Sequence, residues 1–335
     1  MEEMYVRLLE TLPTIALILI AVISLAILSK SADFLVDEAV SLSIRWGIPK
    51  SIIGATIVSL GTTLPEASVS VLAAIQGNPD LALGNGVGSI IADTGLILGL
   101  AAIIGYLPID QRTLNRQGRI QIGSALLLVI IALPMFGRNN QGIIHQWMGF
   151  GLLFLLVVYM FMMVHWAKNG NETFEKLDVV KSPAILQVAK LFFAISMVIF
   201  SSKLLIPSIE LSAIRFGIPQ SIIAATLVAF GTSLPELTTA IAAVRKGHGE
   251  LAVGNIIGAD ILNVLFVIGA AAAVTTKGLT VDTSFYQLQF PAMVIILLAF
   301  RRFAKSKDHC ISRKEGIILV SLYMVYIILS YTWIR

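Results

Sequence analysis

The sequence is short of charge and nearly free of cysteine, and each shortage excludes a class of protein. Only 13% of its 335 residues are Asp, Glu, Lys or Arg, and 57% are hydrophobic, whereas a soluble domain is about a quarter charged. Cys310 is the single cysteine, so an intrachain disulfide is impossible. The four histidines lie at the ends of apolar runs or in loops and show no metal-ligand spacing. The composition therefore predicts a polytopic integral membrane protein.

The chain also lacks any polar segment long enough for a soluble domain. Its longest polar connection is 168–182, and its basic residues are spread over short loops, so the net charge of +4 indicates no nucleic-acid partner. The acidic N-terminus has no basic n-region, so we expect the first apolar run to be kept as a span rather than cleaved as a leader. Ten runs are long enough to cross a bilayer, at about 14–39, 49–76, 80–105, 117–136, 143–167, 184–209, 219–244, 250–275, 284–303 and 314–333.

The two halves of the chain are repeats of each other. Residues 47–99 align with 217–269 without a gap, with 23 identities over 53 positions that include glycines, prolines and one glutamate. Because each half has five spans, the second half must enter the bilayer from the opposite side. We therefore predict an all-α polytopic fold of ten transmembrane helices: a first inverted five-helix repeat in 1–168, a linker in 169–183 and a second repeat in 184–335.

The charges of the loops predict the orientation of the chain. The side that holds the connections after spans 1, 3, 5, 7 and 9 carries 16 Lys and Arg residues, and the other side carries 5. Cytoplasmic loops are the ones enriched in Lys and Arg. The linker 169–183 is therefore expected to be cytoplasmic and both termini to lie outside.

One hexapeptide occurs twice inside apolar runs, as Gly-Thr-Thr-Leu-Pro-Glu in 61–66 and as Gly-Thr-Ser-Leu-Pro-Glu in 231–236. A proline removes a helical hydrogen bond, so the backbone before it should open and free carbonyl oxygens. A glutamate inside a span is costly and usually functional. Carbonyl, hydroxyl and carboxylate oxygens together suit a hard cation such as Ca²⁺. The candidate ligands are Ser59, Thr62, Thr63 and Glu66 in the first repeat, and Ala229, Thr232, Ser233 and Glu236 in the second.

The span after each motif adds a second layer of polar residues. Ser89 and Asp93 are four residues apart and share one helix face, as do Ala259 and Asn263. We interpret Asp93 and Asn263 as further ligands.

Other residues of these spans have more than one interpretation. We interpret the glycines as points where helices pack closely; they are Gly84, Gly88, Gly254 and Gly258. Asn85 and Asn255 fit either a ligand role or a packing role. Asp260 is an additional carboxylate, and it fits an ion pair with Lys203 or Lys190 as well as a proton site.

The doubled Gly-Thr-[Ser/Thr]-Leu-Pro-Glu motif, each copy followed by Gly-Asn-x-x-Gly, resembles the alpha repeats of the calcium/cation antiporter superfamily, and in particular its prokaryotic sodium/calcium exchanger branch. The resemblance covers nearly the whole chain. It implies exchange of Ca²⁺ against Na⁺ across the cytoplasmic membrane of a prokaryote, at four ion sites in the middle of spans 2, 3, 7 and 8, with spans 14–39 and 184–209 sliding across this core. The implied ligands are Thr62, Thr63, Glu66, Ser89, Asp93, Thr232, Ser233, Glu236 and Asn263, together with the backbone carbonyls of Ser59 and Ala229.

The chain departs from the family pattern in the second layer. Ala259 and Asp260 stand where the pattern usually has Ser-Asn, so one hydroxyl is missing and one carboxylate is added. The acidic member of the second layer is Asp93 in the first repeat, with Asn263 in the second, whereas many relatives have the reverse.

We interpret the chain as a secondary active antiporter of Ca²⁺ and Na⁺ that needs no cofactor and is not an enzyme. Carboxylates that are empty and ionised repel one another, so we expect the site to hold Ca²⁺, several Na⁺ or protons, and low pH to inhibit transport. The alternative is a proton-coupled antiporter of Ca²⁺ or another divalent cation, which the missing hydroxyl at Ala259 slightly favours.

Three other classes are weighed against the sequence: a channel, an enzyme, and a purely structural or sensor membrane protein, of which the last stays open. The inverted repeat argues against a channel, and the chain has neither a His-Glu-x-x-His nor a Gly-x-Ser-x-Gly motif, which argues against an enzyme. The expected partners are the transported cations and the lipid bilayer, and the sequence indicates no particular protein partner.

Overall fold

The computed structural model describes residues 8–46, 48–134, 142–168, 183–216, 231–306 and 308–333. Most of these residues are helical. The helices of the first half are α2 (Thr14–Trp46), α3 (Lys50–Ile53), α4 (Ser59–Thr62), α5 (Leu64–Ile75), α6 (Pro79–Ile91), α7 (Leu98–Ile104), α8 (Gln111–Ile131) and α9 (Gln146–Lys168). Those of the second half are α10 (Ala184–Arg215), α13 (Leu234–Arg245), α14 (Gly249–Leu262), α15 (Gly269–Ala273), α16 (Phe290–Ala304) and α17 (Arg313–Trp333). Four π-helical turns join some of them, namely η1 (Gly54–Val58), η2 (Ala92–Ile97), η5 (Asn263–Ile268) and η6 (Phe285–Gln289).

Six helices in the described part of the chain are long and apolar enough to cross a membrane, and a bent pair, Lys50–Thr62 with Leu64–Ile75, makes a seventh. Two more of the expected spans are helices of 21 residues, α8 and α17. The first of these carries three arginines in its N-terminal half, which lower its hydropathy. The start of the expected span 219–244 and almost all of the linker 169–183 lie outside the described residues. The count of ten spans therefore stays a prediction.

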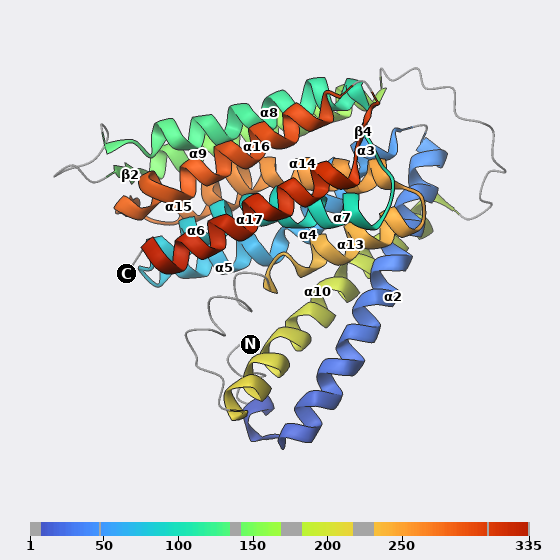
Figure 1. Cartoon of the computed structure of the whole chain (residues 1–335), viewed down its shortest axis with the longest axis horizontal. Coiled ribbons are helices and arrows are strands. Elements are labelled where there is room, and N and C mark those ends of the chain that lie inside the picture. The colour runs from blue at the N-terminus through green and yellow to red at the C-terminus, as the bar shows by residue number, and fades with distance from the viewer. Residues whose placement is uncertain are drawn as a thin grey trace.

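The helices form a bundle from which one pair projects. α2 and α10 lie side by side and extend away from the remaining helices (Figure 1). The segments Pro79–Ile104 and Gly249–Ala273 are the most enclosed candidate spans, with 72% and 89% of their apolar windows buried, against 28% for α2. These two segments are the third spans of the two predicted repeats, so the polar residues that they carry lie in the protein interior.

Four short strands depart from the all-α expectation. β1 (Leu107–Pro108) pairs antiparallel with β4 (Cys310–Ile311), and β2 (Gly142–Ile144) pairs antiparallel with β3 (Leu279–Val281). The strands are two or three residues long and lie in loops, where two-residue pairings leave no sequence pattern. Each pair joins a loop of the first half to a loop of the second, and the two pairs lie at opposite ends of the bundle (Figure 1). The loops after spans 3 and 9 thus lie at one end, as the predicted orientation requires.

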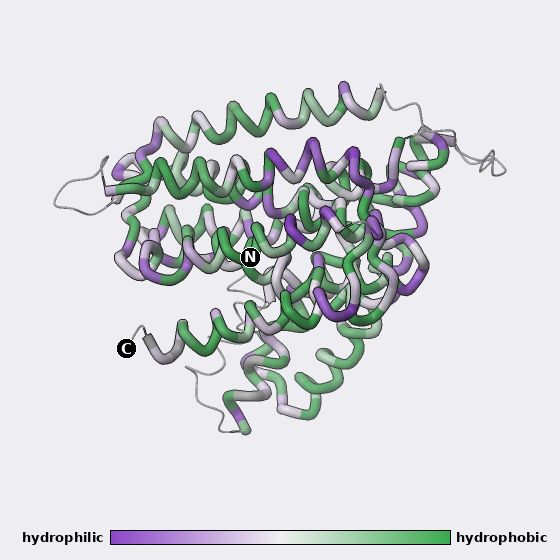
Figure 2. Tube along the Cα trace, turned by 45° about the horizontal axis from the view of Figure 1, so that its top comes forward, coloured by the Kyte–Doolittle hydropathy of each residue, from purple (hydrophilic) through white to green (hydrophobic). Residues whose placement is uncertain are grey.

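Large apolar side chains cover the outer helices. Ile15, Phe154, Phe161, Phe192 and Ile318 are each between 45% and 74% exposed. Figure 2 shows hydrophobic residues along most of the length of these helices. Apolar surface of this extent is typical of a protein face in contact with lipid.

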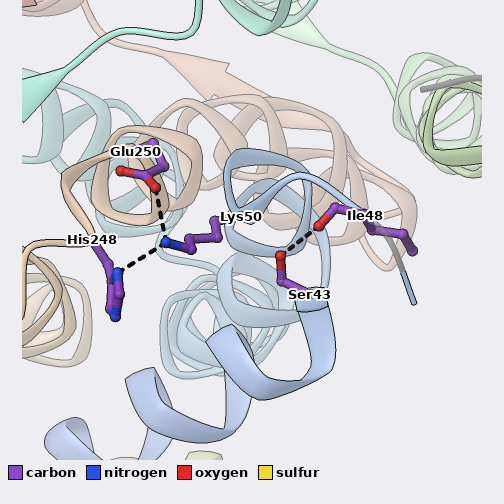
Figure 3. Close-up of polar contacts among 5 residues, drawn as sticks. All are labelled: Ser43, Ile48, Lys50, His248 and Glu250. Atoms are coloured by element: carbon purple, nitrogen blue, oxygen red, sulfur yellow. Dashed lines mark hydrogen bonds and ion pairs between the residues drawn. The ribbon is translucent and has the colours of Figure 1, made fainter. Parts of the chain in front are cut away.

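A small charged cluster of Lys50, His248 and Glu250 connects the start of the second span to the start of the eighth. The Lys50 ammonium lies 3.2 Å from Glu250 Oε1 and 3.1 Å from His248 Nδ1, as Figure 3 shows. In the same region the Ser43 hydroxyl donates to the carbonyl of Ile48 and closes the turn that leads into α3. Because an ammonium can only donate, His248 Nδ1 accepts here and must be unprotonated.

The contact between His248 and Lys50 predicts an acid-sensitive stability. Partial burial and the positive charge of Lys50 lower the pKa of His248 below its ordinary value of 6.5, with a smaller opposing effect from Glu250 and Asp37. The unfolded chain therefore binds this proton first as the pH falls below 6.5, so acid favours unfolding. Purified H248Q should lose less melting temperature between pH 7.5 and pH 5.5 than the wild type does.

An exposed histidine provides the control for this experiment. His309 lies in a loop at φ 50°, a backbone conformation that asparagine tolerates. H309N should keep the full acid-induced loss of melting temperature. An equal loss in the wild type and in H248Q would show that the acid sensitivity arises elsewhere.

Candidate functional site

The repeated hexapeptide places a glutamate in the first turn after a helix break. The helices Lys50–Thr62 and Leu64–Ile75 meet at an angle of 43°, which confirms the break expected before Pro65. Glu66 lies in the first turn of α5, and Glu236 in the first turn of α13. The positive end of a helix dipole faces each carboxylate there and favours its negative charge. The expectation of a freed Ser59 carbonyl is wrong in one respect, because this oxygen accepts the Thr63 N–H at 2.9 Å and the Thr62 hydroxyl at 3.4 Å.

Carboxylates from both halves of the chain lie together in the interior. Glu66 is within electrostatic range of Glu236 and of Asp93. Each of the three side chains is only 1% exposed. Both oxygens of Glu66, Oε2 of Glu236 and Oδ1 of Asp93 have no hydrogen-bond partner among the described residues. Buried oxygens of this kind are costly unless a cation or a proton satisfies them.

Hydroxyl groups from the opposite repeat surround these carboxylates. Thr62 and Thr63 lie beside the carboxylate of Glu236, and Ser233 lies beside that of Asp93. The Ser233 hydroxyl also reaches the hydroxyl of Ser89 at 3.5 Å. Each repeat therefore contributes its hydroxyls to the carboxylate of the other.

The second-layer residues lie at the start of π-helical turns. Asp93 is the second residue of η2, and Asn263 is the first residue of η5. A π-turn disturbs the regular helical hydrogen bonds and is often found at functional sites. The Asn263 Oδ1 atom is buried and has no partner among the described residues. The residue pattern of these spans does not indicate the turns, and only their equivalent positions in the two repeats could have suggested them.

The two motif asparagines have different environments. The Asn85 amide nitrogen donates to the carbonyl of Glu66 at 3.0 Å and to Ser70 Oγ at 2.9 Å, and its Oδ1 accepts from Thr232 at 3.3 Å. Asn85 thus has the packing role, and it holds Thr232 close to the site. Both polar side-chain atoms of Asn255 are buried without a partner in the described part of the chain, so Asn255 keeps its candidacy as a ligand.

Two of the four glycines have the packing role that we expected. A Cβ atom on Gly254 would lie 2.1 Å from the carbonyl oxygen of Ser51, and one on Gly258 would lie 2.6 Å from Ala55. The eighth span therefore lies backbone to backbone against η1 and its neighbours. Gly84 and Gly88 show no such backbone contact among the described residues. The segment of the second repeat that corresponds to η1 and its neighbours, 217–230, falls outside the described residues.

The motif glycines make room for α10. A Cβ atom on Gly61 would lie 2.7 Å from the side chain of Ile195, and one on Gly231 would lie 2.8 Å from that of Ile206. Both isoleucines belong to α10. This helix therefore packs directly on the two turns that carry the glutamates.

Most of the predicted ligands come together, and the assignment of each as a ligand stays a prediction. Ser59, Thr62, Thr63, Glu66, Ser89, Asp93, Ser233, Glu236 and Asn263 are all 2% exposed or less, and Thr232 is half-buried. Ala229 lies outside the described residues. No three His, Cys, Asp or Glu side chains in the described ranges converge closely enough to hold a metal ion by themselves. Hydroxyl, amide and carbonyl oxygens therefore have to complete any cation site here.

Asp260 does not pair with a lysine. Its Oδ2 atom accepts from Thr94 Oγ1 at 2.5 Å and from Gln121 Nε2 at 2.6 Å, and its Oδ1 atom is buried without a partner among the described residues. Lys190 lies 3.4 Å from Glu38 instead. The ion pairs considered for Asp260 are therefore wrong, and neutral donors hold this carboxylate.

Comparisons with known proteins agree with this geometry. The family described as sodium/calcium exchanger protein matches residues 16–165 and 186–332. Inner membrane protein YrbG of Escherichia coli is 32% identical over 92% of this chain and 95% of its own length. Sodium/calcium exchanger MaX1 of Methanosarcina acetivorans is 28% identical over 93% of this chain and 98% of its own length. Among solved structures, the sodium-calcium exchanger NCX_Mj superposes with a TM-score of 0.81 at 26% identity, over 94% of this chain and 99% of that one.

Proposed function

The chain belongs to the sodium/calcium exchanger protein family, and we propose that it exchanges Ca²⁺ for Na⁺ across a membrane by alternating access. As a member of this family it is an integral membrane transporter of inorganic cations rather than an enzyme. In this proposal the ions bind between the spans that contain α4, α5, α6, α13 and α14. The proposed ligands are the oxygens of Ser59, Thr62, Thr63, Glu66, Ser89, Asp93, Ala229, Thr232, Ser233, Glu236 and Asn263.

One observation carries the proposal. Three buried carboxylates from both repeats lie within electrostatic range of one another, and they keep bare oxygens toward a set of hydroxyls. No ion pair in the described part of the chain neutralises any of the three. Such a cluster is stable only with positive charge inside it. Either one Ca²⁺ or several Na⁺ can supply that charge, and both would be bound by the same oxygens. Two ions that compete for one set of ligands are the physical basis of exchange.

The gate of this transporter is proposed to be the projecting pair α2 and α10. Ile195 and Ile206 of α10 pack against Gly61 and Gly231, the first residues of the two ligand motifs. A shift of α10 along its axis would move these side chains across the ligand turns and so expose them to one end of the bundle or the other. Differences in how well each ion draws the turns together would then decide when the pair can move.

Transport assays in proteoliposomes test the proposal. Vesicles loaded with Na⁺ and diluted into Na⁺-free buffer should take up ⁴⁵Ca²⁺, and uptake should vanish when Na⁺ is equal on both sides. A pH gradient without Na⁺ should drive no more uptake than protein-free vesicles show. Uptake driven by the pH gradient alone would instead identify the chain as a proton-coupled antiporter.

A further inference from the structure

Asp260 is a fourth buried carboxylate beside the proposed exchange site. Its side chain is 2% exposed, and it lies within electrostatic range of Asp93. Both of its hydrogen-bond donors, Thr94 and Gln121, are neutral. These donors orient Oδ2 but contribute no charge, so Oδ1 of Asp260 and Oδ1 of Asp93 both remain bare in the interior.

The environment of Asp260 breaks the symmetry of the two repeats. With the offset of 170 residues that aligns them, Asp260 corresponds to Ile90 and Thr94 corresponds to Val264. Gln121 comes from α8, which packs against α14. The second repeat therefore has a carboxylate, Asp260, where the first repeat has the apolar Ile90. A site at Asp260 has no counterpart in the first repeat.

A line of polar side chains leads from this carboxylate toward the surface. Gln117 and Gln121 are four residues apart and lie on one face of α8, and Gln117 Oε1 is buried without a partner among the described residues. Gln117 also lines a cavity of about 20 Å³ at the N-terminal end of α8, together with Thr113 and Arg116. A cavity of this size has room for about one water molecule. The same face of α8 therefore carries polar side chains from this cavity to Asp260.

We propose that Asp260 and Asp93 together bind one Na⁺ ion, at a site beside the Glu66–Glu236 pair that is reached along the polar face of α8. The proposal rests on the proposed function, because it adds a monovalent cation to the same ion cluster. Ca²⁺ does not suit this position, since it takes about six to eight oxygens and often binds carboxylates through both atoms. Thr94 and Gln121 already occupy Oδ2 of Asp260, so this carboxylate offers a cation only its bare Oδ1 atom, next to the bare Oδ1 atom of Asp93.

The number of Na⁺ ions that stabilise the folded protein tests this site without transport. When ligand is in excess, stability rises with the logarithm of the ligand concentration in proportion to the number of ions bound. The melting temperature of the purified protein is measured in Ca²⁺-free buffer as NaCl replaces choline chloride at constant ionic strength. D260N should show a slope smaller by one ion than the wild type, and both should be stabilised equally by Ca²⁺.

Two further variants complete the experiment. S124A alters another buried hydroxyl of α8, one that donates to the Gln121 carbonyl of its own helix, and it should keep the wild-type slope. T94V keeps the carboxylate but removes one of its hydrogen bonds, so the Na⁺ concentration at which the melting temperature begins to rise should increase about fivefold. T94V decides the question alone if D260N does not fold.

Each outcome has one meaning. An unchanged Na⁺ slope in folded D260N, or an unchanged onset concentration in T94V, overturns the proposal and leaves Asp260 as a structural group. Loss of Ca²⁺ stabilisation together with the Na⁺ slope also overturns it, because Asp260 would then serve the Glu66–Glu236 site. Failure of Ca²⁺ and Na⁺ to stabilise even the wild type would count against the proposed exchange function itself.

Discussion

Replacing Glu66 or Glu236 with glutamine is expected to reduce Na⁺-driven Ca²⁺ uptake to the level of protein-free vesicles. The amide keeps the shape of the side chain but removes a full negative charge from a pocket in which both glutamates are 1% exposed. Changes to residues that merely support a metal ligand usually weaken metal binding about 10- to 100-fold. Loss of a carboxylate ligand itself should therefore weaken Ca²⁺ binding by at least about 100-fold.

The same substitution at a surface glutamate provides the control. Glu250 pairs with Lys50 at the start of α14, with its side chain 29% exposed. A surface ion pair contributes at most about 1 kcal/mol, so E250Q should fold and transport as the wild type does. Binding of ⁴⁵Ca²⁺ to the purified protein separates lost ion affinity from lost movement. If E66Q or E236Q kept Ca²⁺ binding and uptake near the wild-type level, the assignment of these glutamates to the ion site would be wrong.

The sequence predicted the parts of the site that depend on local chemistry. A proline directly before a glutamate predicts a helix break with a carboxylate in the following turn, and the 43° bend before Pro65 confirms the break. The internal repeat predicted that Glu66 and Glu236 belong to one pocket, and the two carboxylates do lie within electrostatic range. Both inferences need only the order of residues along one helix and the match between two segments.

The remaining features depend on contacts between distant segments, which one sequence does not encode in any readable pattern. Gln121 reaches Asp260 across 139 positions, so the partner of that carboxylate could not be identified from its neighbours in the chain. Ile195 fills the space above Gly61, and a glycine in a span gives no indication of which residue will approach it. The π-turns at Asp93 and Asn263 pack against several helices, and helix periodicity alone does not predict them.

The polar residues of the second layer show how repeats can share a fold but not a charge pattern. Asp93 and Asn263 occupy equivalent π-turns, yet only the first is acidic, and Asp260 places a further carboxylate in the repeat that carries the asparagine. Each repeat therefore contributes one acidic residue to this layer, but Asp93 and Asp260 are not at equivalent positions of the two repeats. The total charge stays balanced between the halves while its location shifts toward α8, where Gln121 holds Asp260.

Replacing Gly254 with alanine is expected to prevent the protein from folding, although a single methyl group is added. The new Cβ would lie 2.1 Å from the carbonyl oxygen of Ser51 and 2.7 Å from its Cα, and backbone atoms cannot move aside as a flexible side chain can. Overpacking of a core usually costs about 1–3 kcal/mol. We expect at least the upper end of this range, because α14 is the most enclosed of the candidate spans in the described residues.

Thermal melting in detergent and the yield of monodisperse protein measure this effect, with Gly151 as the matched control. Gly151 lies on the exposed face of α9, and a Cβ there meets nothing within 4 Å among the described residues. Alanine is a better helix former than glycine by about 1 kcal/mol, so G151A should melt at the wild-type temperature or slightly above it. G254A should give little monodisperse protein and a much lower melting temperature. Equal behaviour of the two variants would mean that the span carrying Glu66 and the span carrying Asp260 do not pack backbone to backbone at Ser51. The arrangement of these two spans around the carboxylates would then be wrong.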